Sequence, residues 1–254
     1  MVMQEFIALA NMLADAAGEI VQTYYRQPFD VERKGDDSPV TIADRAVETR
    51  LREIIEDARP QDGILGEEFG KKESQSGLTW VLDPIDGTKS FMIGRATFGT
   101  LIALCEGDQP VLGVIDQPIL GERWTGVDGA QTTMNGGPVR TRPCATLAEA
   151  RIGSTTPAMF SKTGPVYERF ETGSRLAWGG DCYMYGLIAS GYMDMALEAS
   201  LSPYDFAALV PVVKGAGGMI CDWDGHALTL DSDGRVVALG DPGLWPEVQK
   251  ILAD

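Results

Sequence analysis

The sequence predicts a mixed α/β protein, and three observations carry that prediction. Residues 4–25 place apolar side chains at helical spacing along one wide face, as expected for an amphipathic helix. Residues 42–58 form a second helical segment. Two apolar, β-rich runs, 98–105 and 111–118, are separated by a polar segment with Gly and Pro, which is the pattern of a β-hairpin. The first half of the chain therefore combines helices with an antiparallel sheet.

The remaining elements alternate in the same way. Residues 63–66 predict a short strand, and residues 122–127 extend the hairpin into a meander. The second half begins at 151–154, and apolar runs bounded by turn residues predict strands at 175–178, 193–198, 219–221 and 236–239. Helices are predicted at 165–170, 183–190, 205–215 and 242–252. Pro211 lies inside the third of these helices and is expected to kink it.

Length and charge narrow the class of protein. The chain has 254 residues, which is enough for a substantial core in one large domain or two closely joined halves. Asp and Glu total 37 against 21 Lys and Arg, so the net charge is −16. Such a charge repels nucleic acid and anionic membranes, and we expect neither as a partner. It also repels a phosphate substrate, unless bound cations reverse the local field at the site.

Cysteine usage and the N-terminus indicate the compartment. The four cysteines, Cys105, Cys144, Cys182 and Cys221, include no closely spaced pair, so a zinc knuckle or a redox dithiol is not expected. The first ten residues lack the basic segment of a secretory signal, and no apolar run approaches the length of a membrane span. We therefore expect a cytoplasmic protein with four reduced, at least partly buried thiols.

The strongest functional signal is a strand that ends in two acids. Trp80 to Leu82 is a short apolar run typical of a buried strand, and Pro84 is expected to end it. Asp83 and Asp86 follow at a spacing of three residues. Carboxylate oxygens are the ligands that hard divalent cations prefer, so this strand end can hold a metal ion.

The residues after the second acid add an anion site. Gly87 and Thr88 open the segment 89–93, which can form the first turn of a helix, and free N–H groups at a helix start can hold a phosphate. The alternative is an ordinary turn with solvated acids. Two further motifs argue against that alternative: G-E-E-F-G at 66–70 and S-P-Y-D-F-A-A at 202–208. A metal site beside an anion site indicates phosphoryl chemistry.

In this order and at these spacings, G-E-E, W-V-L-D-P-I-D-G-T and P-Y-D-x-A-A resemble the inositol monophosphatase family of metal-dependent, lithium-sensitive phosphatases, over nearly the whole chain. The resemblance implies a layered α-β-α-β-α sandwich of the inositol monophosphatase and fructose-1,6-bisphosphatase type. It implies one phosphatase domain, residues 1–254, with a metal-binding half at about 1–145 and a substrate-specificity half at about 146–254. A homodimer is expected on the same ground.

The resemblance also assigns the metal site. It implies two or three Mg²⁺ ions, with Mn²⁺ as a possible substitute, and Asp83 as a ligand that bridges two of them. The implied protein ligands are Glu67, Asp83, the carbonyl of Ile85, Asp86 and Asp205. These ligands come from three separated segments, which no single local motif provides.

The implied catalytic residues are Asp44, Thr88 and Glu67. The Thr88 hydroxyl and the Asp44 carboxylate would orient and deprotonate the attacking water, because a threonine alone is a poor base. The alternative for Asp44 is a helix-capping acid, since Thr41 stands three residues before it. Lys34 and Asp36, on the loop before this helix, are weaker candidates.

The chain resembles the histidinol-phosphate phosphatase branch most closely, through W-G-G-D-C-Y at 178–183, T-F-G-T at 97–100, V-I-D-Q-P at 114–118 and the tyrosine before Asp205. The expected substrate is a small phosphate ester, and the implied substrate contacts are Gly87, Thr88, Asp181, Glu198 and Asp205. Asp181 and Glu198 can face a cationic amino-imidazole, and their alternative is capping and surface charge. Inositol-1-phosphate, a sugar bisphosphate and phosphoadenosine phosphate remain alternative substrates, and a non-catalytic binder of a phosphorylated ligand is the alternative class.

One other motif has a rival interpretation. D-W-D-G at 222–225 resembles the nucleophile motif of haloacid-dehalogenase phosphatases, but only about thirty residues follow it, too few for that fold. His226, the only histidine, lies in the same segment, so a histidine-dependent triad would have to form there. We predict a surface turn.

Overall fold

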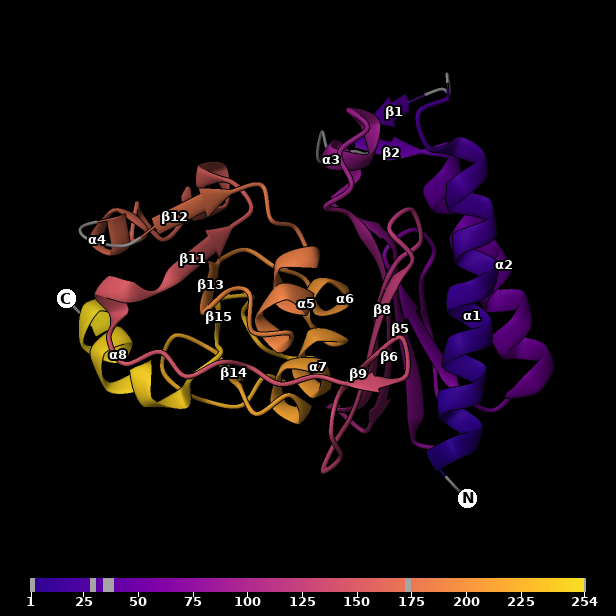
Figure 1. The fold of residues 1–254 in the computed structure, drawn as a ribbon. Coiled ribbons are helices and arrows are strands. Elements are labelled where there is room, and N and C mark those ends of the chain that lie inside the picture. The colour runs from indigo at the N-terminus through magenta and orange to yellow at the C-terminus, as the bar shows by residue number, and fades with distance from the viewer. Residues whose placement is uncertain (1–2, 28–30, 34–38, 172–174, 254) are drawn as a thin grey trace.

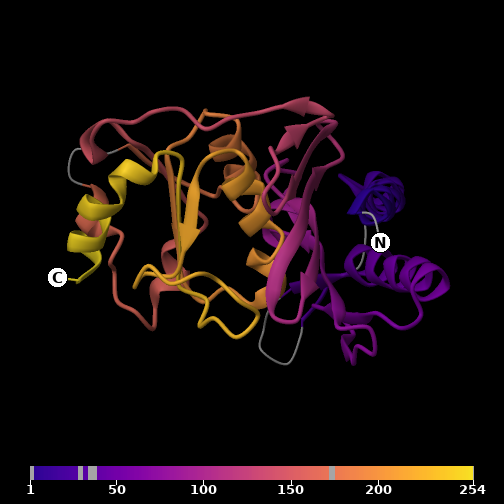
Figure 2. The same cartoon turned by 90° about the horizontal axis from the view of Figure 1, so that it is seen from below.

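Two β-sheets alternate with three layers of helices in the computed structural model, which describes residues 3–27, 31–33, 39–171 and 175–253 (Figure 1). Seen from below, one set of helices lies between the sheets, and the others cover the outer faces (Figure 2). This order confirms the α-β-α-β-α sandwich that the sequence predicts. Lys34 and Asp36 lie outside the described residues.

The first helical layer consists of α1 (Met3–Tyr24) and α2 (Ile42–Ala58), both close to their predicted bounds. Their apolar faces pack against the larger sheet. A capping box begins α2: the Thr41 hydroxyl accepts the N–H of Asp44 at 3.2 Å, and the Asp44 carboxylate accepts the N–H of Thr41 at 2.8 Å. The predicted capping role of Asp44 is confirmed, and it fixes the side chain in the first turn.

The larger sheet has eight strands within the described residues, in the order β10-β9-β8-β7-β6-β5-β3-β4. Their bounds in that order are Gly137–Pro138, Thr133–Met134, Glu122–Val127, Gln109–Gln117, Gly99–Glu106, Leu78–Asp86, Gly63–Gly66 and Gly70–Lys72. The predicted hairpin is β6–β7, and β8 continues the meander. Only β3 and β5 are parallel neighbours here. A separate pair is formed by β1 (Val31–Arg33) and β2 (Pro39–Thr41).

Pro84 does not end the central strand, contrary to the prediction. Strand β5 continues through Pro84 to Asp86, while its register against β6 shifts between Asp83 and Asp86. A proline has no N–H for the ladder, so it is tolerated at such an irregularity. Its carbonyl accepts the Thr100 hydroxyl at 2.8 Å. Both acids are therefore held by the strand and not by a free turn.

The central layer contains α5 (Tyr183–Ala189), α6 (Pro203–Phe206) and α7 (Leu209–Gly215), whereas α3 (Thr88–Met92) follows β5. The prediction of one helix over 205–215 with a kink at Pro211 is wrong. The helical hydrogen bonding is interrupted at Ala207 and Ala208, although both residues keep helical torsion angles. Pro211 has no N–H to bond the Ala207 carbonyl four residues back, so the interruption falls one turn before the proline.

The smaller sheet has five strands in the order β12-β11-β13-β15-β14. Their bounds in that order are Arg175–Trp178, Arg151–Ser154, Met195–Glu198, Val236–Leu239 and Met219–Cys221. Both β12 and β13 run parallel to β11. The outer layer contains α4 (Glu168–Glu171), which is shorter than the predicted helix at 165–170, and α8 (Trp245–Ala253). Short 3₁₀ helices occupy Leu147–Glu149, Pro157–Phe160 and Pro242–Leu244.

Three apolar cores fill the spaces between the layers. The central core contains Cys105 and Cys182, and the outer core beneath α8 contains Cys144 and Cys221. All four cysteines are buried and free. None of the described helices combines the length and the apolar character that a membrane span requires.

Close packing between β7 and the central helices depends on Gly113. A Cβ atom there would lie 2.0 Å from the Ala208 carbonyl oxygen, a backbone atom that cannot rotate away. We expect Gly113→Ala to lower the free energy of unfolding by about 3 kcal/mol in urea denaturation. Gly137→Ala is the matched control, because its Cβ would meet its nearest neighbour at 3.5 Å. Equal unfolding midpoints for the two variants would contradict this packing argument.

Candidate active site

The candidate site lies where parallel strands of both sheets end. In the larger sheet, β3 and β5 run parallel, and Glu67 and Gly87 follow their carboxyl ends. In the smaller sheet, β11 and β12 run parallel, and Thr155 and Gly179 follow theirs. Residues from both sheets line one cavity of about 330 Å³. Strand ends of this kind are the usual place for ligand sites in α/β proteins.

Three carboxylates meet beside this cavity. One oxygen each of Asp83, Asp86 and Asp205 lies within 4.8 Å of the others. Asp86 accepts the backbone N–H of Cys182 at 2.6 Å, and Asp205 accepts that of Ser202 at 2.6 Å, as the capping acid of α6. Within the described part of the chain, the Oδ1 atom of Asp83 is buried without a hydrogen-bond partner.

Glu67 and Ile85 complete the set of predicted metal ligands. Glu67 follows β3, and its N–H donates to the Leu82 carbonyl at 3.3 Å, which holds it beside β5. Its charge is the largest charge acting on Asp83. The Ile85 carbonyl accepts the Thr88 hydroxyl at 3.2 Å. The four acids therefore come from three segments of the chain. The Ile85 carbonyl lies in β5, between Asp83 and Asp86.

Burial and mutual repulsion disfavour ionisation of these acids. Burial raises the pKa of Asp83 and of Asp86 well above the usual range, and neighbouring carboxylates raise both further. Burial also raises the pKa of Asp205 to about 7, although the Ser202 N–H opposes the shift. Asp44, one turn into the neighbouring helix, has its pKa raised to about 7 by burial.

The donor set fits a hard divalent cation. All the converging groups are oxygens, and the buried Asp83 oxygen without a partner faces no N–H or O–H within the described residues. Mg²⁺ prefers carboxylate and carbonyl oxygens, and its charge would restore ionisation of the acids. The residues that would hold it are Glu67, Asp83, Asp86, Asp205 and the Ile85 carbonyl.

Asp44 at the start of α2 and Thr88 at the start of α3 are the predicted pair for the attacking water. The Oδ2 atom of Asp44 makes the capping box with Thr41, while Oδ1 has no hydrogen-bond partner among the described residues. The charges of Glu67 and Glu68 act on it, so its free oxygen belongs to the acid cluster. The Thr88 hydroxyl donates to Ile85, and no hydrogen bond joins it to Asp44 in the part of the chain that the structure describes.

Gly87 and Asp181 pack directly against each other. Gly87 has a left-handed φ of 82°, and a Cβ atom there would lie 2.8 Å from the Asp181 carboxyl carbon. Asp181 itself has a φ of 43°, and its carboxylate accepts the hydroxyls of Ser90 at 2.6 Å and Thr97 at 2.5 Å. It also lines the cavity. The structure thus places this predicted substrate contact in the cavity wall, with structural partners of its own.

Glu198 lies behind the wall. It ends β13, is buried, and accepts the Tyr185 hydroxyl at 2.8 Å and the Thr155 N–H at 3.2 Å. Burial raises its pKa to about 8. Because Thr155 lines the cavity, Glu198 supports the cavity wall through this hydrogen bond.

Sequence reasoning missed several residues that line the cavity. These are Lys89, Ser90, Ile93, Arg95, Thr155, Thr156 and Gly179. Thr155 and Thr156 directly follow β11, a strand that the sequence analysis did not predict. Arg95 crosses between the halves of the chain, because its guanidinium donates to the Trp178 carbonyl at 3.2 Å. No local pattern marks that contact.

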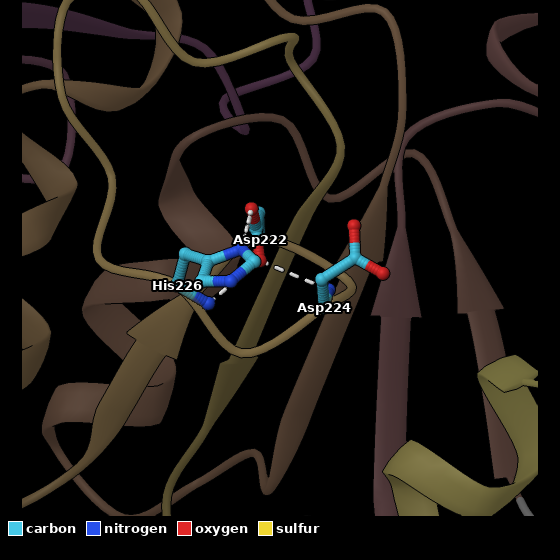
Figure 3. A group of neighbouring side chains, drawn as sticks. All are labelled: Asp222, Asp224 and His226. Carbon is cyan, nitrogen blue, oxygen red and sulfur yellow. Dashed lines mark hydrogen bonds and ion pairs between the residues drawn. The ribbon is translucent and has the colours of Figure 1, made fainter.

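The second acidic group is a turn, as predicted (Figure 3). Asp222 accepts the backbone N–H groups of Asp224 at 2.9 Å and His226 at 2.7 Å, and it lies 3.1 Å from the His226 ring. Asp224 pairs with Arg235 at 2.8 Å. Asp224 and His226 are exposed. These contacts account for the acids as local turn structure, so this segment is not a second candidate site.

Comparison with known proteins agrees with this geometry. A model of the inositol monophosphatase family matches residues 2–253. The chain is 47% identical to "Bifunctional phosphatase IMPL2, chloroplastic" of Arabidopsis thaliana over 93% of its length and 69% of that protein. It is 38% identical to a histidinol-phosphatase of Chlorobaculum parvum, over 91% of each chain. The structure of an inositol monophosphatase from Zymomonas mobilis superposes with a TM-score of 0.91, at 44% identity over the full length of both chains.

The raised pKa values predict how stability depends on pH without metal. Asp44 and Asp205 have pKa values near 7 in the fold, above those of an unfolded chain, so the folded state binds more protons at intermediate pH. The protonated acids contribute fully to the free energy of unfolding at a pH below their pKa in the unfolded chain. This contribution is lost as the pH rises through about 7, their pKa in the fold. The melting temperature of the chelator-treated protein should therefore fall between about pH 5 and pH 8.

Added Mg²⁺ should raise the melting temperature more at the upper end of this pH range, because the acids are deprotonated there and can bind the cation. Scanning calorimetry across the pH series measures both effects. Asp83→Asn, which removes one repelling carboxylate, should flatten the decline. A melting temperature that rises steadily to pH 8 without metal would contradict the assignment.

Proposed function

The chain belongs to the inositol monophosphatase family of metal-dependent phosphatases, and we propose that it hydrolyses L-histidinol phosphate to L-histidinol and phosphate with Mg²⁺. The observation that carries the choice of substrate is the acidic character of the specificity side of the cavity, where Glu198 becomes negatively charged above its pKa of about 8. Asp181 lies in the wall, and Glu198 stands directly behind it. Histidinol phosphate carries a cationic amine that such charge favours.

The acids position a metal and the phosphate together. Asp83, Asp86, Asp205 and Glu67 would hold the cation, with the Ile85 carbonyl. When bound, Mg²⁺ supplies positive charge that polarises the phosphoryl and water oxygens. The left-handed turn at Gly87 aims the start of α3 into the cavity, so the N–H groups of Gly87 and Thr88 are placed to bind phosphate oxygens.

Asp44 and Thr88 are the proposed pair that handles the proton of the attacking water. The free Oδ1 atom of Asp44 is the acceptor, and the Thr88 hydroxyl orients the water by a hydrogen bond. The water oxygen forms a bond to phosphorus while the ester bond opposite it breaks, and the leaving alkoxide takes up a proton. No covalent enzyme intermediate is required.

Inositol-1-phosphate is the second candidate substrate. It is favoured by the full-length similarity to the structure of the Zymomonas mobilis inositol monophosphatase. The similarity to the Chlorobaculum parvum histidinol-phosphatase favours the first candidate. The two esters place opposite demands on Asp181 and Glu198, because an inositol ring carries hydroxyls and no positive charge.

Phosphate release by the purified protein tests the proposal. Histidinol phosphate, inositol-1-phosphate, fructose-1,6-bisphosphate and phosphoadenosine phosphate should be compared side by side with Mg²⁺. We expect histidinol phosphate to have the highest kcat/KM, and chelator or Asp83→Asn to lower it by at least about a hundredfold. Preference for inositol-1-phosphate would overturn the substrate assignment and keep the metal site, and release from none of the esters would overturn the proposed activity.

Glu198→Gln separates the charge of Glu198 from its hydrogen bonds. The amide can still accept the Thr155 N–H, so the wall keeps its support, while the negative charge that Glu198 carries above its pKa of about 8 is lost; the assays are therefore run at about pH 9. We expect KM for histidinol phosphate to rise about five- to tenfold and KM for inositol-1-phosphate to change less than about twofold.

Glu122→Gln is the matched control for this variant. Glu122 accepts the Tyr183 hydroxyl at 2.6 Å, as Glu198 accepts that of Tyr185, but it does not line the cavity. Its two KM values should stay unchanged. Equal increases in KM for both esters in the Glu198 variant would show that Glu198 acts only as structural support.

A further inference from the structure

We propose that Glu48, a residue on α2 without an assigned role, positions Glu67 for metal binding by holding the turn on which Glu67 stands. The proposal rests on the proposed function for its consequence in catalysis, but its geometry is independent of the substrate. Glu48 is completely buried and lies one helical turn after Asp44. Helix α2 therefore presents two carboxylates, one to the acid cluster and one to this turn.

The turn that carries Glu67 connects two strands, and its first N–H, that of Glu67, donates to the Leu82 carbonyl. Strands β3 and β4 form a tight hairpin in which Gly66 pairs with Gly70, so Glu67, Glu68 and Phe69 make the connection. Hairpin geometry leaves N–H groups in such a connection outside the ladder. The Glu68 and Phe69 N–H groups are only partly buried, and an acceptor within the protein fixes the turn where water would leave it free to move.

Glu48 provides that acceptor with both oxygens. Its Oε2 atom accepts the Glu68 N–H at 2.7 Å, and its Oε1 atom accepts the Phe69 N–H at 3.1 Å. Two parallel hydrogen bonds to one carboxylate fix the orientation of the turn as well as its position. The peptide immediately before them belongs to Glu67, so the direction of the Glu67 side chain follows from this contact.

Two further features hold the Glu48 carboxylate in place. Arg52, one turn later on α2, pairs with Oε1 at 2.8 Å, and its other nitrogen donates to the Gly70 carbonyl. A Cβ atom at Gly66 would lie 2.0 Å from Oε1, so a glycine keeps the space that the carboxylate occupies. The backbone of Gly66 is not left-handed, and close approach alone explains the glycine.

Metal affinity measures this role separately from folding. Calorimetric titration of Mg²⁺ into the full chain gives the dissociation constant, and Asp83→Asn identifies the heat that belongs to the acid cluster. Glu48→Gln can accept only one of the two N–H groups and should raise the dissociation constant about tenfold. With the best ester, the Mg²⁺ concentration for half-maximal activity should rise by the same factor, and KM for the ester should change less than about threefold.

Glu53→Gln is the matched control, because Glu53 lies on the same helix but is exposed and pairs only at the surface with Arg50. It should leave the dissociation constant within about twofold of the wild-type value. Should Glu48→Gln not fold, Arg52→Lys provides a milder perturbation. This substitution leaves Glu48 intact, but a lysine lacks the planar guanidinium that bonds both Glu48 and Gly70. We expect the Mg²⁺ dissociation constant to rise about threefold.

An unchanged dissociation constant in folded Glu48→Gln, or in folded Arg52→Lys where the first variant does not fold, would overturn the inference. An equal loss of affinity in Glu53→Gln would overturn it as well. If the wild-type protein binds Mg²⁺ but hydrolyses none of the esters, the proposed function fails, and calorimetry still decides the role of Glu48.

Discussion

Holding carboxylates that repel one another inside the protein is the constraint on which the rest of this structure depends. Asp83, Asp86 and Asp205 meet within 4.8 Å, and burial already disfavours their charged forms. Burying unpaired carboxylates costs free energy. Without a bound cation, the packing of the apolar cores on both sides of the cluster must offset that cost. Metal binding and folding stability are therefore linked at this site.

The two-sheet architecture brings the carboxylates together from different layers of the fold. One sheet contributes the acids of β5, and the central layer contributes Asp205 at the start of α6. The parallel strands β11 and β12 add the far wall of the cavity. Because the ligands come from different layers, small shifts between the layers would separate them. The close contact of β7 with the Ala208 carbonyl, possible only at Gly113, limits such shifts.

Sequence reasoning reached the parts of the site that are encoded locally. The spacing of Asp83 and Asp86 and the capping box at Asp44 are properties of short segments, and both are present in the structure. Arg95 and its contact with Trp178 depend on residues 83 positions apart, which no local pattern contains. The two prolines were misjudged for a related reason: Pro84 is tolerated by a register shift against β6, and Pro211 acts on the turn before it.

The anchoring of the acids shows why capping and metal binding are compatible roles. A carboxylate has two oxygens, and Asp44, Asp86 and Asp205 each use Oδ2 to accept a backbone N–H from Thr41, Cys182 and Ser202. In Asp44 and Asp205 this bond is a local helix cap, whereas in Asp86 it joins residues 96 positions apart. In each case one oxygen fixes the side chain, and the carboxylate has a second oxygen that can face a cation. The side chain of a capping acid is thus already oriented by the fold. It loses little further side-chain entropy when a cation binds. The local signals that favour a structural role therefore also identify the residues best prepared to bind metal.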